Sequence, residues 1–416
     1  MFRAKYFNLS FLLLFLFLFI RCSTEQQPVF SGLDVLIREK QDIIRGKRVG
    51  IITNQTAITK DKQHIVDALT ALPRVNITAL FAPEHGIRGD REGGEYIDSY
   101  IDSLTGIKVY SLYGKSRKPA GTMLDSIDVL LFDIQDIGAR FYTYISTMGL
   151  AMEAAAERGI PFVVLDRPNP ITGEIVEGPV LQPSVKSFVG RYPIPIRHGM
   201  TVGELAEMIN GEGWLKNGVH AALTVVPVKN WHRLQWFDQT GLPWVKTSPN
   251  MPNLESATLY PGMGLLEGIN ISEGRGTDEP FVKIGAPWFE PEKMLHELSG
   301  IWVYGVKLQP IQFFPVSMPD ATLHPEYENE QCKGFRIDVY DRNVFRAVSF
   351  AVYLICTAEK LYPDQILFTR GFDRLAGNMN LKQQIINGTP AKVIIAGWEN
   401  EIENFKQMRQ KYLLYK

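Results

Sequence analysis

Polar side chains that could do acid–base chemistry gather in four short stretches, each of which follows an apolar run. Carboxylates, amides, a histidine and arginines stand close together there, which is the mixture that a site for a polar ligand needs. The four groups are Glu84, His85 and Arg88; Asp133, Gln135, Asp136, Arg140 and Tyr142; Asp166 and Asn169; and Glu273, Arg275 and Thr277. Three further polar loop residues join them as binding candidates, namely Asn54, His198 and Asn250.

Carboxylates in such numbers point first to the hydrolysis of a glycosidic bond. In this reaction one carboxylic acid protonates the leaving oxygen, and a second carboxylate acts as base or nucleophile. The candidate catalytic acids are Glu84, Asp133, Asp136 and Glu273. Aromatic residues in the same stretches, such as Tyr142, offer flat surfaces on which a sugar ring could stack.

Two other reaction types fit the same residues less well. Glu84, His85 and the aspartates could hold a divalent metal for phosphoester hydrolysis, but their spacing matches no ligand motif, so we expect no metal. Nucleophilic serine catalysis lacks its G-x-S-x-G turn in this chain. No G-x-G-x-x-G fingerprint follows the first expected strand, and we therefore expect no nucleotide cofactor.

Each candidate also has an ordinary structural explanation. Asp133 or Asp136 could cap the following helix, with Arg140 as its ion-pair partner. A lone histidine such as His85 or His198 more often orders a loop through a backbone hydrogen bond than acts on a substrate. The joint occurrence of these residues at the ends of successive apolar runs favours a site over such separate roles.

The strands that must position these residues are visible as short apolar runs. Residues 129–132 form a run without alternation, which is typical of a strand buried on both faces of a parallel sheet. Comparable runs alternate with helical segments in the first part of the chain, and this predicts an α/β fold with a doubly wound, mostly parallel sheet. The other expected strands cover residues 48–54, 76–81, 109–112 and 161–165. Ligands of open α/β sheets bind outside the carboxyl ends of the strands, so we expect the polar residues to meet at that edge.

The chain divides into three segments. We expect a leader at residues 1–27, a catalytic α/β domain at 28–285 and a smaller α/β domain at 286–416 that closes one side of a cleft. The last segment contains strand-like runs at 301–308 and 335–339 and few residues able to do chemistry. A two-domain enzyme with its cleft between the domains is the arrangement that this division favours.

The bulk charge argues against a nucleic-acid partner. The 416 residues include 44 basic and 45 acidic side chains, so the net charge is −1. Proteins that bind nucleic acids carry a basic patch or stripe, and the sequence contains none. Composition does not predict an oligomeric state.

The N-terminus is typical of an export signal. Arg3 and Lys5 precede an apolar stretch at 9–20, and Cys22 follows it. We expect an exported protein that is periplasmic or associated with the cell envelope. Attachment of a lipid to Cys22 would make it an outer-membrane lipoprotein, although Arg21 stands where such signals usually have a small residue; simple export and an uncleaved anchor are the alternatives.

Five motifs of this chain resemble those of the bacterial exo-β-N-acetylmuramidases, a family once catalogued only as a domain of unknown function. They are GIITN at 50–54, APEHGIRG at 82–89, FDIQDIGAR at 132–140, LDRPNP at 165–170 and EGRGT at 273–277. The resemblance extends from about residue 30 to the C-terminus, and several motifs are long enough to be specific.

This resemblance implies a Rossmann-like domain without a nucleotide, a second α/β subdomain and a cleft between them. It also implies release of N-acetylmuramic acid from the non-reducing end of peptidoglycan fragments during cell-wall turnover or recycling. Glu84 has the strongest claim to the acid/base role, since the family motif places it at a strand tip. The lactyl carboxylate of the sugar would need a cation, for which Arg140 and Arg275 are the candidates.

The partner of Glu84 stays open at this stage. Asp133, Asp136, Glu273 or the acetamido group of the substrate could each serve, so the stereochemical course is not predicted. A non-catalytic, envelope-bound glycan-binding lipoprotein is the alternative from a different functional class. The density of loop acids favours the enzyme, because binding alone does not require it.

Overall fold

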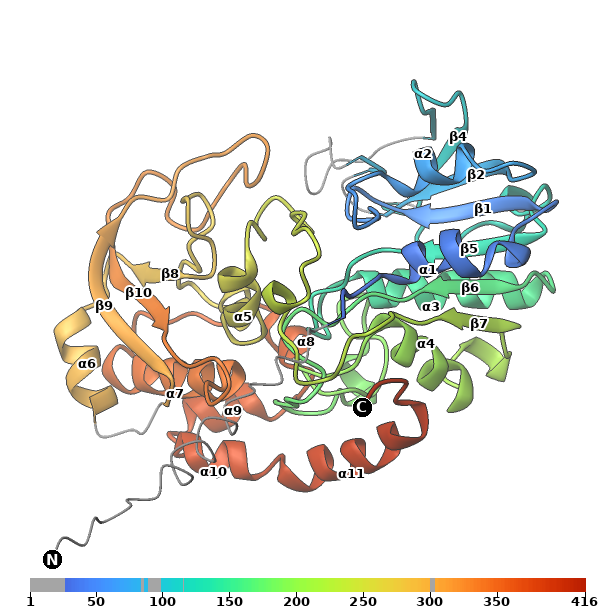
Figure 1. The fold of residues 1–416 in the computed structure, drawn as a ribbon. Helices are drawn as coiled ribbons and strands as arrows, with labels where there is room; N and C mark the ends of the chain where they lie inside the picture. The colour runs from blue at the N-terminus through green and yellow to red at the C-terminus, as the bar shows by residue number, and fades with distance from the viewer. Residues whose placement is uncertain (1–26, 84–85, 89–98, 115, 300–303) are drawn as a thin grey trace, which may run out of the picture.

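Two lobes, each built on its own β-sheet, make up the computed structural model of this chain (Figure 1). The structure describes residues 27–83, 86–88, 99–114, 116–299 and 304–416. The expected leader with Cys22 lies outside the described residues, except for position 27. Within the described part of the chain, no helix has the length and apolar character needed to cross a membrane.

The first lobe contains a seven-stranded sheet in the order β3-β4-β2-β1-β5-β6-β7. Its strands are β1 (Arg48–Thr53), β2 (Asn76–Ala82), β3 (Tyr100–Ile101), β4 (Lys108–Ser111), β5 (Val129–Asp133), β6 (Phe162–Leu165) and β7 (Leu223–Val226). All neighbours are parallel except β3 and β4. Strands β2 and β4 extend the sheet on one side of β1, and β5, β6 and β7 extend it on the other side. The strand order therefore reverses between β1 and β5, and open α/β sheets bind ligands at such a topological switch point. The predicted α/β fold with a mostly parallel sheet is confirmed.

Helices cover both faces of this sheet because its central strands are apolar on both sides. In β5, Val129 and Leu131 pack in one core cluster, and Leu130 and Phe132 pack in the other. The first cluster includes residues of α1 (Gly32–Glu39) and α2 (Ile65–Thr70), and the second includes residues of α3 (Tyr144–Glu157) and α4 (Val202–Gly211). Burial on both faces explains why the run at 129–132 shows no alternation.

The second lobe contains a three-stranded antiparallel sheet in the order β8-β10-β9. Its strands are β8 (Lys283–Ala286), β9 (Val306–Phe313) and β10 (Cys332–Val339), and its helices are α5 (Leu254–Met263), α6 (Pro291–Ser299), α7 (Ala347–Leu361), α8 (Phe372–Ala376), α9 (Leu381–Ile386), α10 (Ala391–Ala396) and α11 (Glu399–Arg409). The domain boundary expected between 285 and 286 falls inside β8.

The C-terminal residues connect the two lobes. Helix α11 runs from the second lobe beneath the first (Figure 1). We call residues 409–416 the C-terminal strap. The Tyr415 hydroxyl donates a hydrogen bond to Asp166, and Leu414 N donates to Glu204 Oε1 at 2.9 Å. Arg409 Nη1 donates to the Gly199 carbonyl at 2.7 Å, so the strap is fixed to the first lobe along its length.

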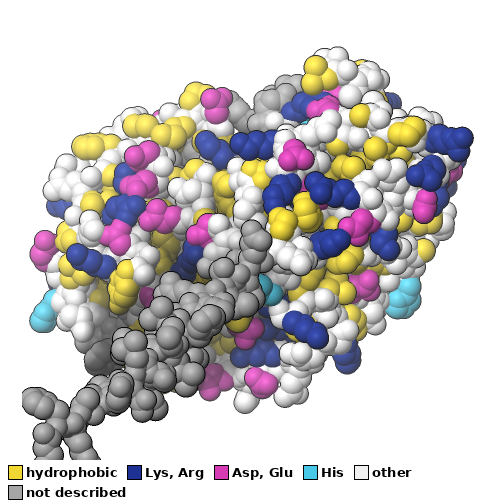
Figure 2. Space-filling model, in the orientation of Figure 1, with side chains coloured by type: hydrophobic (Ala, Val, Ile, Leu, Met, Phe, Trp, Pro, Cys, Tyr) yellow, Lys and Arg dark blue, Asp and Glu magenta, His cyan; other side chains and the backbone are white. Residues whose placement is uncertain are grey.

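Charged side chains of both signs are interspersed over the face of the molecule in Figure 2. Lysine and arginine side chains lie next to aspartate and glutamate side chains on both lobes. This mixed surface agrees with a net charge of −1.

Candidate active site

A cleft of about 430 Å³ opens between the lobes. The first lobe supplies residues that follow strands β4 and β5, and the second supplies residues from helices and loops. These are Tyr113 and residues 141–144 on one side, and Tyr260, Glu267, Arg275 and residues 321–323 on the other. Two larger hollows, of about 720 and 780 Å³, lie beside α9 and beside α11. Neither is lined by a candidate residue from the sequence, whereas Tyr142, Asn250 and Arg275 line the cleft.

Tyrosines form the wall contributed by the first lobe. The Tyr142 hydroxyl donates to Thr247 Oγ1 at 2.7 Å, and the Tyr144 hydroxyl donates to the Thr247 carbonyl at 2.8 Å. The two rings meet edge to face at 5.0 Å, and Tyr260 meets Tyr142 in the same way at 5.8 Å. Helix α3 begins at Tyr144, so the segment that follows β5 enters the helix at the cleft.

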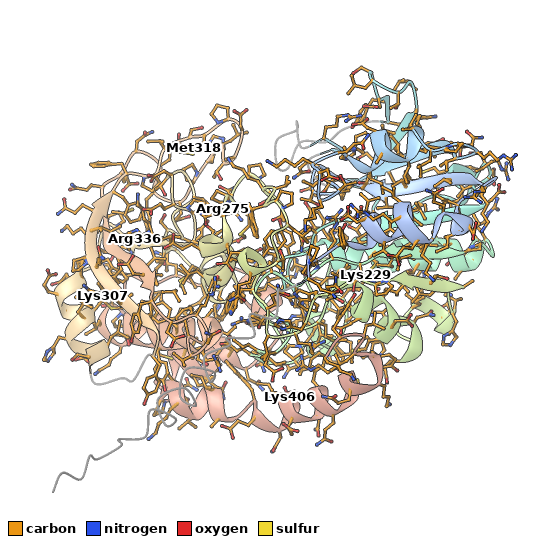
Figure 3. The ribbon with its side chains drawn as sticks, in the orientation of Figure 1. Lys229, Arg275, Lys307, Met318, Arg336 and Lys406 are labelled. Atoms are coloured by element: carbon orange, nitrogen blue, oxygen red, sulfur yellow. The ribbon has the colours of Figure 1, made fainter. Side chains whose placement is uncertain are left out.

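A glycine-rich turn presents Arg275 from the second lobe (Figure 3). Gly274 and Gly276 have φ angles of 83° and 77°, a region that favours glycine. A Cβ on Gly274 would lie 2.5 Å from the Lys283 carbonyl oxygen, so the close neighbour of this turn is the protein's own backbone. The Thr277 hydroxyl donates to the Gly274 carbonyl at 2.7 Å and thus closes the turn.

Two carboxylates flank the Arg275 guanidinium. Nη2 lies 3.0 Å from Glu267 Oε1, and Nε lies 3.0 Å from Glu273 Oε1. Burial raises the pKa of Glu273 to about 7, with Arg275 opposing the shift and Glu267 adding to it. Burial lowers the pKa of Arg275, but the two glutamates outweigh this effect and hold it above its ordinary value. Arg275 therefore stays charged in the wall of the cleft.

Asn250 lies between two loops of the cleft wall. Its Nδ2 donates to the Ala321 carbonyl at 2.9 Å and to Thr322 Oγ1 at 3.0 Å. These bonds fix the loop at 248–250 against the loop between β9 and β10. Asn250 lines the cleft and also holds its shape.

The acids and amides at the ends of β1 and β5 form a closed layer. Asp133 Oδ2 accepts from Arg167 Nη2 at 2.9 Å; burial raises the Asp133 pKa and Arg167 opposes that shift. Asn54 Oδ1 accepts from the Thr56 backbone N–H at 3.0 Å. Gln135 Nε2 donates to the carbonyls of residues 136 and 168, each at 2.8 Å. Asn54, Asp133 and Gln135 do not line the cleft.

The next group of candidates orders the turn that leads to the tyrosines. Asp136 Oδ2 accepts from the Gly138 N–H at 2.7 Å and lies 3.7 Å from His198 Nε2. Asn169 Nδ2 donates to the Met200 carbonyl at 2.9 Å. Asp166 is fully buried; burial raises its pKa to about 7, and the Tyr415 hydroxyl opposes the shift. All four candidates are buried outside the cleft.

Arg140 is occupied by main-chain oxygens. Nη1 donates to the carbonyls of Pro179 and Ile194 at 2.7 and 2.8 Å, and Nη2 donates to that of Ala376 at 2.7 Å. Burial lowers its pKa to about 9. Its guanidinium joins the first lobe to α8 and does not line the cleft.

Arg88 also has internal partners. Its guanidinium lies 3.2 Å from Asp102 and 3.3 Å from Asp67 of α2. The hydrogen bond with Asp102 raises the Arg88 pKa, against a smaller opposing effect of burial. This side chain fixes the segment after β2 to the sheet edge.

Glu84 and His85 lie outside the described residues. The strand before them ends at Ala82, which is in register with Ser111 of β4. Two residues after Ser111, Tyr113 lines the cleft. The chain therefore leaves β2 at the edge of the sheet where the cleft opens.

Sequence reasoning missed Glu267 and Tyr260. Glu267 lies in the 3₁₀ helix η7 (Gly264–Gly268), and Tyr260 lies in α5. The available signal was a single acid, Glu267, in the otherwise uncharged stretch 256–272. Among the described residues, no group of three or more histidine, cysteine, aspartate or glutamate side chains is placed to hold a metal.

The fold and cleft define a two-lobed α/β protein whose site lies at the carboxyl edge of a mostly parallel sheet. The chain belongs to the exo-beta-N-acetylmuramidase NamZ family: the model of the N-terminal domain matches residues 49–255, and that of the C-terminal domain matches residues 258–415. The suspected family resemblance is confirmed.

Individual relatives agree with this assignment. The chain is 46% identical over 395 residues to the peptidoglycan beta-N-acetylmuramidase NamZ of Bacillus subtilis (strain 168), covering 94% of this chain and 93% of the relative. Two crystal structures of DUF1343 family proteins from Bacteroides fragilis have the same fold. Their TM-scores are 0.86 and 0.78 and their identities 38% and 35%, and each comparison covers 94% of this chain and 99% of the other.

Proposed function

We propose that this chain is an exo-acting glycosidase that releases N-acetylmuramic acid from the non-reducing end of peptidoglycan fragments. The observation that carries the proposal is the 46% identity to a peptidoglycan β-N-acetylmuramidase over 94% of the chain. Both lobes are included in that similarity, so the cleft between them is included as well.

The cleft has the size and chemistry that such a substrate needs. Its volume of about 430 Å³ suits a small ligand, since pockets of roughly 300–1,000 Å³ are typical. Tyr142 and Tyr260 supply aromatic surface for a sugar ring. Arg275 supplies a guanidinium that can pair with the lactyl carboxylate of muramic acid through two parallel hydrogen bonds.

We assign the acid/base role to Glu84. A carboxylic acid there protonates the glycosidic oxygen, and the same group then activates the attacking water. Asp133 and Asp136 are engaged by Arg167 and by the Gly138 N–H, which speaks against either as a nucleophile. Glu273 is nearly buried beside Arg275 and does not line the cleft, so the acetamido group of the substrate is the favoured partner of Glu84.

Hydrolysis of an aryl β-N-acetylmuramide tests this assignment. We expect wild type to release the aryl group and Glu84→Gln to lose about 100- to 10,000-fold in kcat. Glu290→Gln is the matched control, because Glu290 is exposed and its only ion-pair partner among the described residues is Lys293. Wild-type binding without any release would instead favour a glycan-binding protein.

Export is part of the proposal. Arg3, Lys5, the apolar stretch at 9–20 and Cys22 support it. We expect the protein in the periplasmic or envelope fraction of cells. Metabolic labelling with a fatty acid, compared between wild type and Cys22→Ser, decides between lipid attachment and simple secretion.

A further inference from the structure

An ion pair of the second lobe faces the cleft. Among the described residues that line it, Arg275 is the only cation and Glu267 the only carboxylate. Arg275 Nη2 lies 3.0 Å from Glu267 Oε1, and the two side chains are 30% and 29% exposed. This ion pair is therefore open to a ligand that enters the cleft.

The turn that carries Arg275 and the Arg275 guanidinium have other contacts besides this pair. The Glu273 carbonyl accepts from the Phe281 N–H at 2.6 Å, and the guanidinium carbon lies 5.3 Å from the centre of the Phe281 ring. The Glu273 side chain is only 9% exposed, and its Oε1 lies 3.0 Å from Nε. Of the two flanking acids, only Glu267 can move into the open cleft without leaving a buried position.

We propose that Glu267 occupies, in the free chain, the position on Arg275 that the lactyl carboxylate of the substrate takes in the complex. Glu267 thereby acts as a specificity-determining residue that competes with the substrate for the guanidinium. This inference rests on the proposed function, because it concerns how the same cleft recognises muramic acid.

Competition between two carboxylates explains what the pair does before and after the reaction. Without substrate, Glu267 neutralises Arg275 and keeps it ordered. With substrate, one carboxylate replaces another on the same donors, so the gain in affinity is moderate. The product also carries the lactyl carboxylate, so Glu267 competes with it for the same donors.

A sugar without a carboxylate cannot take the place of Glu267 on Arg275. When an N-acetylglucosaminide binds, the ion pair between Arg275 and Glu267 therefore remains intact. Removing the charge of Glu267 should therefore change the binding of muramic acid and leave the binding of glucosamine unaffected.

The test compares KM and kcat for an aryl β-N-acetylmuramide and an aryl β-N-acetylglucosaminide. We expect Glu267→Gln to lower KM for the muramide about two- to fivefold, the range of a partly exposed ion pair, with kcat unchanged within twofold. Glu267→Asp, whose shorter side chain draws the carboxylate away from Nη2, should shift KM in the same direction. Arg275→Gln should raise KM for the muramide at least tenfold. Glu290→Gln serves again as the charge-matched control.

Other outcomes overturn the inference. An unchanged or raised KM in Glu267→Gln contradicts competition, and a large loss of kcat at constant KM assigns Glu267 to the chemistry instead. If wild type hydrolyses neither substrate, the proposed function fails, but titration with free N-acetylmuramic acid followed by NMR still tests Glu267. In that titration, Glu267→Gln must bind more tightly than wild type, and N-acetylglucosamine must bind both equally.

Discussion

Arg140 stands two residues after Gly138 and Arg275 directly after Gly274, yet their guanidinium groups have opposite surroundings. Arg140 is enclosed by backbone carbonyls, including those of Pro179 and Ala376, and Arg275 lies between two carboxylates in the wall of the cleft. The sequence named both as cations for a lactyl carboxylate and could not separate them. The carbonyls that enclose Arg140 come from residues 39 to 236 positions away, and no local pattern records them.

The raised pKa of the Glu273 side chain predicts that KM depends on pH. Burial raises this pKa to about 7, so the side chain is neutral in acid and becomes ionised as the pH rises through that value. The added negative charge next to Arg275 then opposes an anionic substrate. KM for an aryl muramide should therefore rise between pH 6 and 8, and this step should vanish in Glu273→Gln.

The measurement is KM against pH for wild type and variant at constant ionic strength. The charged groups that influence Glu273 are Arg275, Glu267 and Glu326. An aryl glucosaminide is the control, because it has no carboxylate to repel. A step of equal size in Glu273→Gln would assign the titration to another group.

At the scale of elements, strands were easier to predict than helix α5. Strand β5 is an uninterrupted apolar run, and its register alongside β1 and β6 follows from burial on both faces. Helix α5 contains Pro261 and Gly262 near its end, which normally argue against a helix. It forms because it packs against α7, and such tertiary packing is invisible in the local sequence.

Gly262 allows α5 to approach α7 closely, and a substitution at this position tests the importance of that contact. A Cβ at this position would lie 2.0 Å from the Ala347 carbonyl oxygen, which is backbone and cannot rotate away. Gly262→Ala should therefore push α5 from α7, lower the free energy of unfolding by about 1–3 kcal/mol and displace Tyr260 in the cleft. Gly121→Ala is the control, since its Cβ would meet only the Arg158 side chain at 3.7 Å. Thermal unfolding and KM report the two effects; equal midpoints for both variants would refute the argument.

At the scale of the whole molecule, the C-terminal strap is one of the links between the two lobes. No local pattern in the sequence indicates the return of residues 409–416 to the first lobe, because the partners of Arg409, Leu414 and Tyr415 lie 210 to 249 positions earlier. Asp166 and Glu204 accept from Tyr415 and from the Leu414 N–H. Sequence reasoning treated Asp166 as a ligand-binding residue, and its hydrogen bonds link it to the strap instead.

Removing the Tyr415 hydroxyl, which donates to Asp166, should lower the stability of the protein by an amount that depends on pH. Tyr415→Phe deprives the buried Asp166 carboxylate of a donor, and the cost should be about 1.5–3 kcal/mol when Asp166 is ionised. Burial raises the Asp166 pKa to about 7, so native Asp166 binds its proton more tightly than unfolded Asp166 does. The unfolding free energy that depends on this group is present at low pH and is lost as the pH rises towards 7.

The loss in Tyr415→Phe should accordingly be larger at pH 8 than at pH 5. Urea unfolding at both values measures it. Tyr412→Phe is the matched control, because Tyr412 belongs to the same strap but donates at 2.7 Å to Glu212, which is partly exposed. A loss that is the same at both pH values, or the same in both variants, would assign the effect to packing alone.

The contact between Tyr415 and Asp166 also bears on the order in which the protein is made. Its two residues are 249 positions apart, so a growing chain contains the aspartate long before the tyrosine. Until synthesis is nearly complete, the end of β6 lacks the group that covers it. The set of hydrogen bonds around Asp166 is therefore complete only once the last residues of the chain are present.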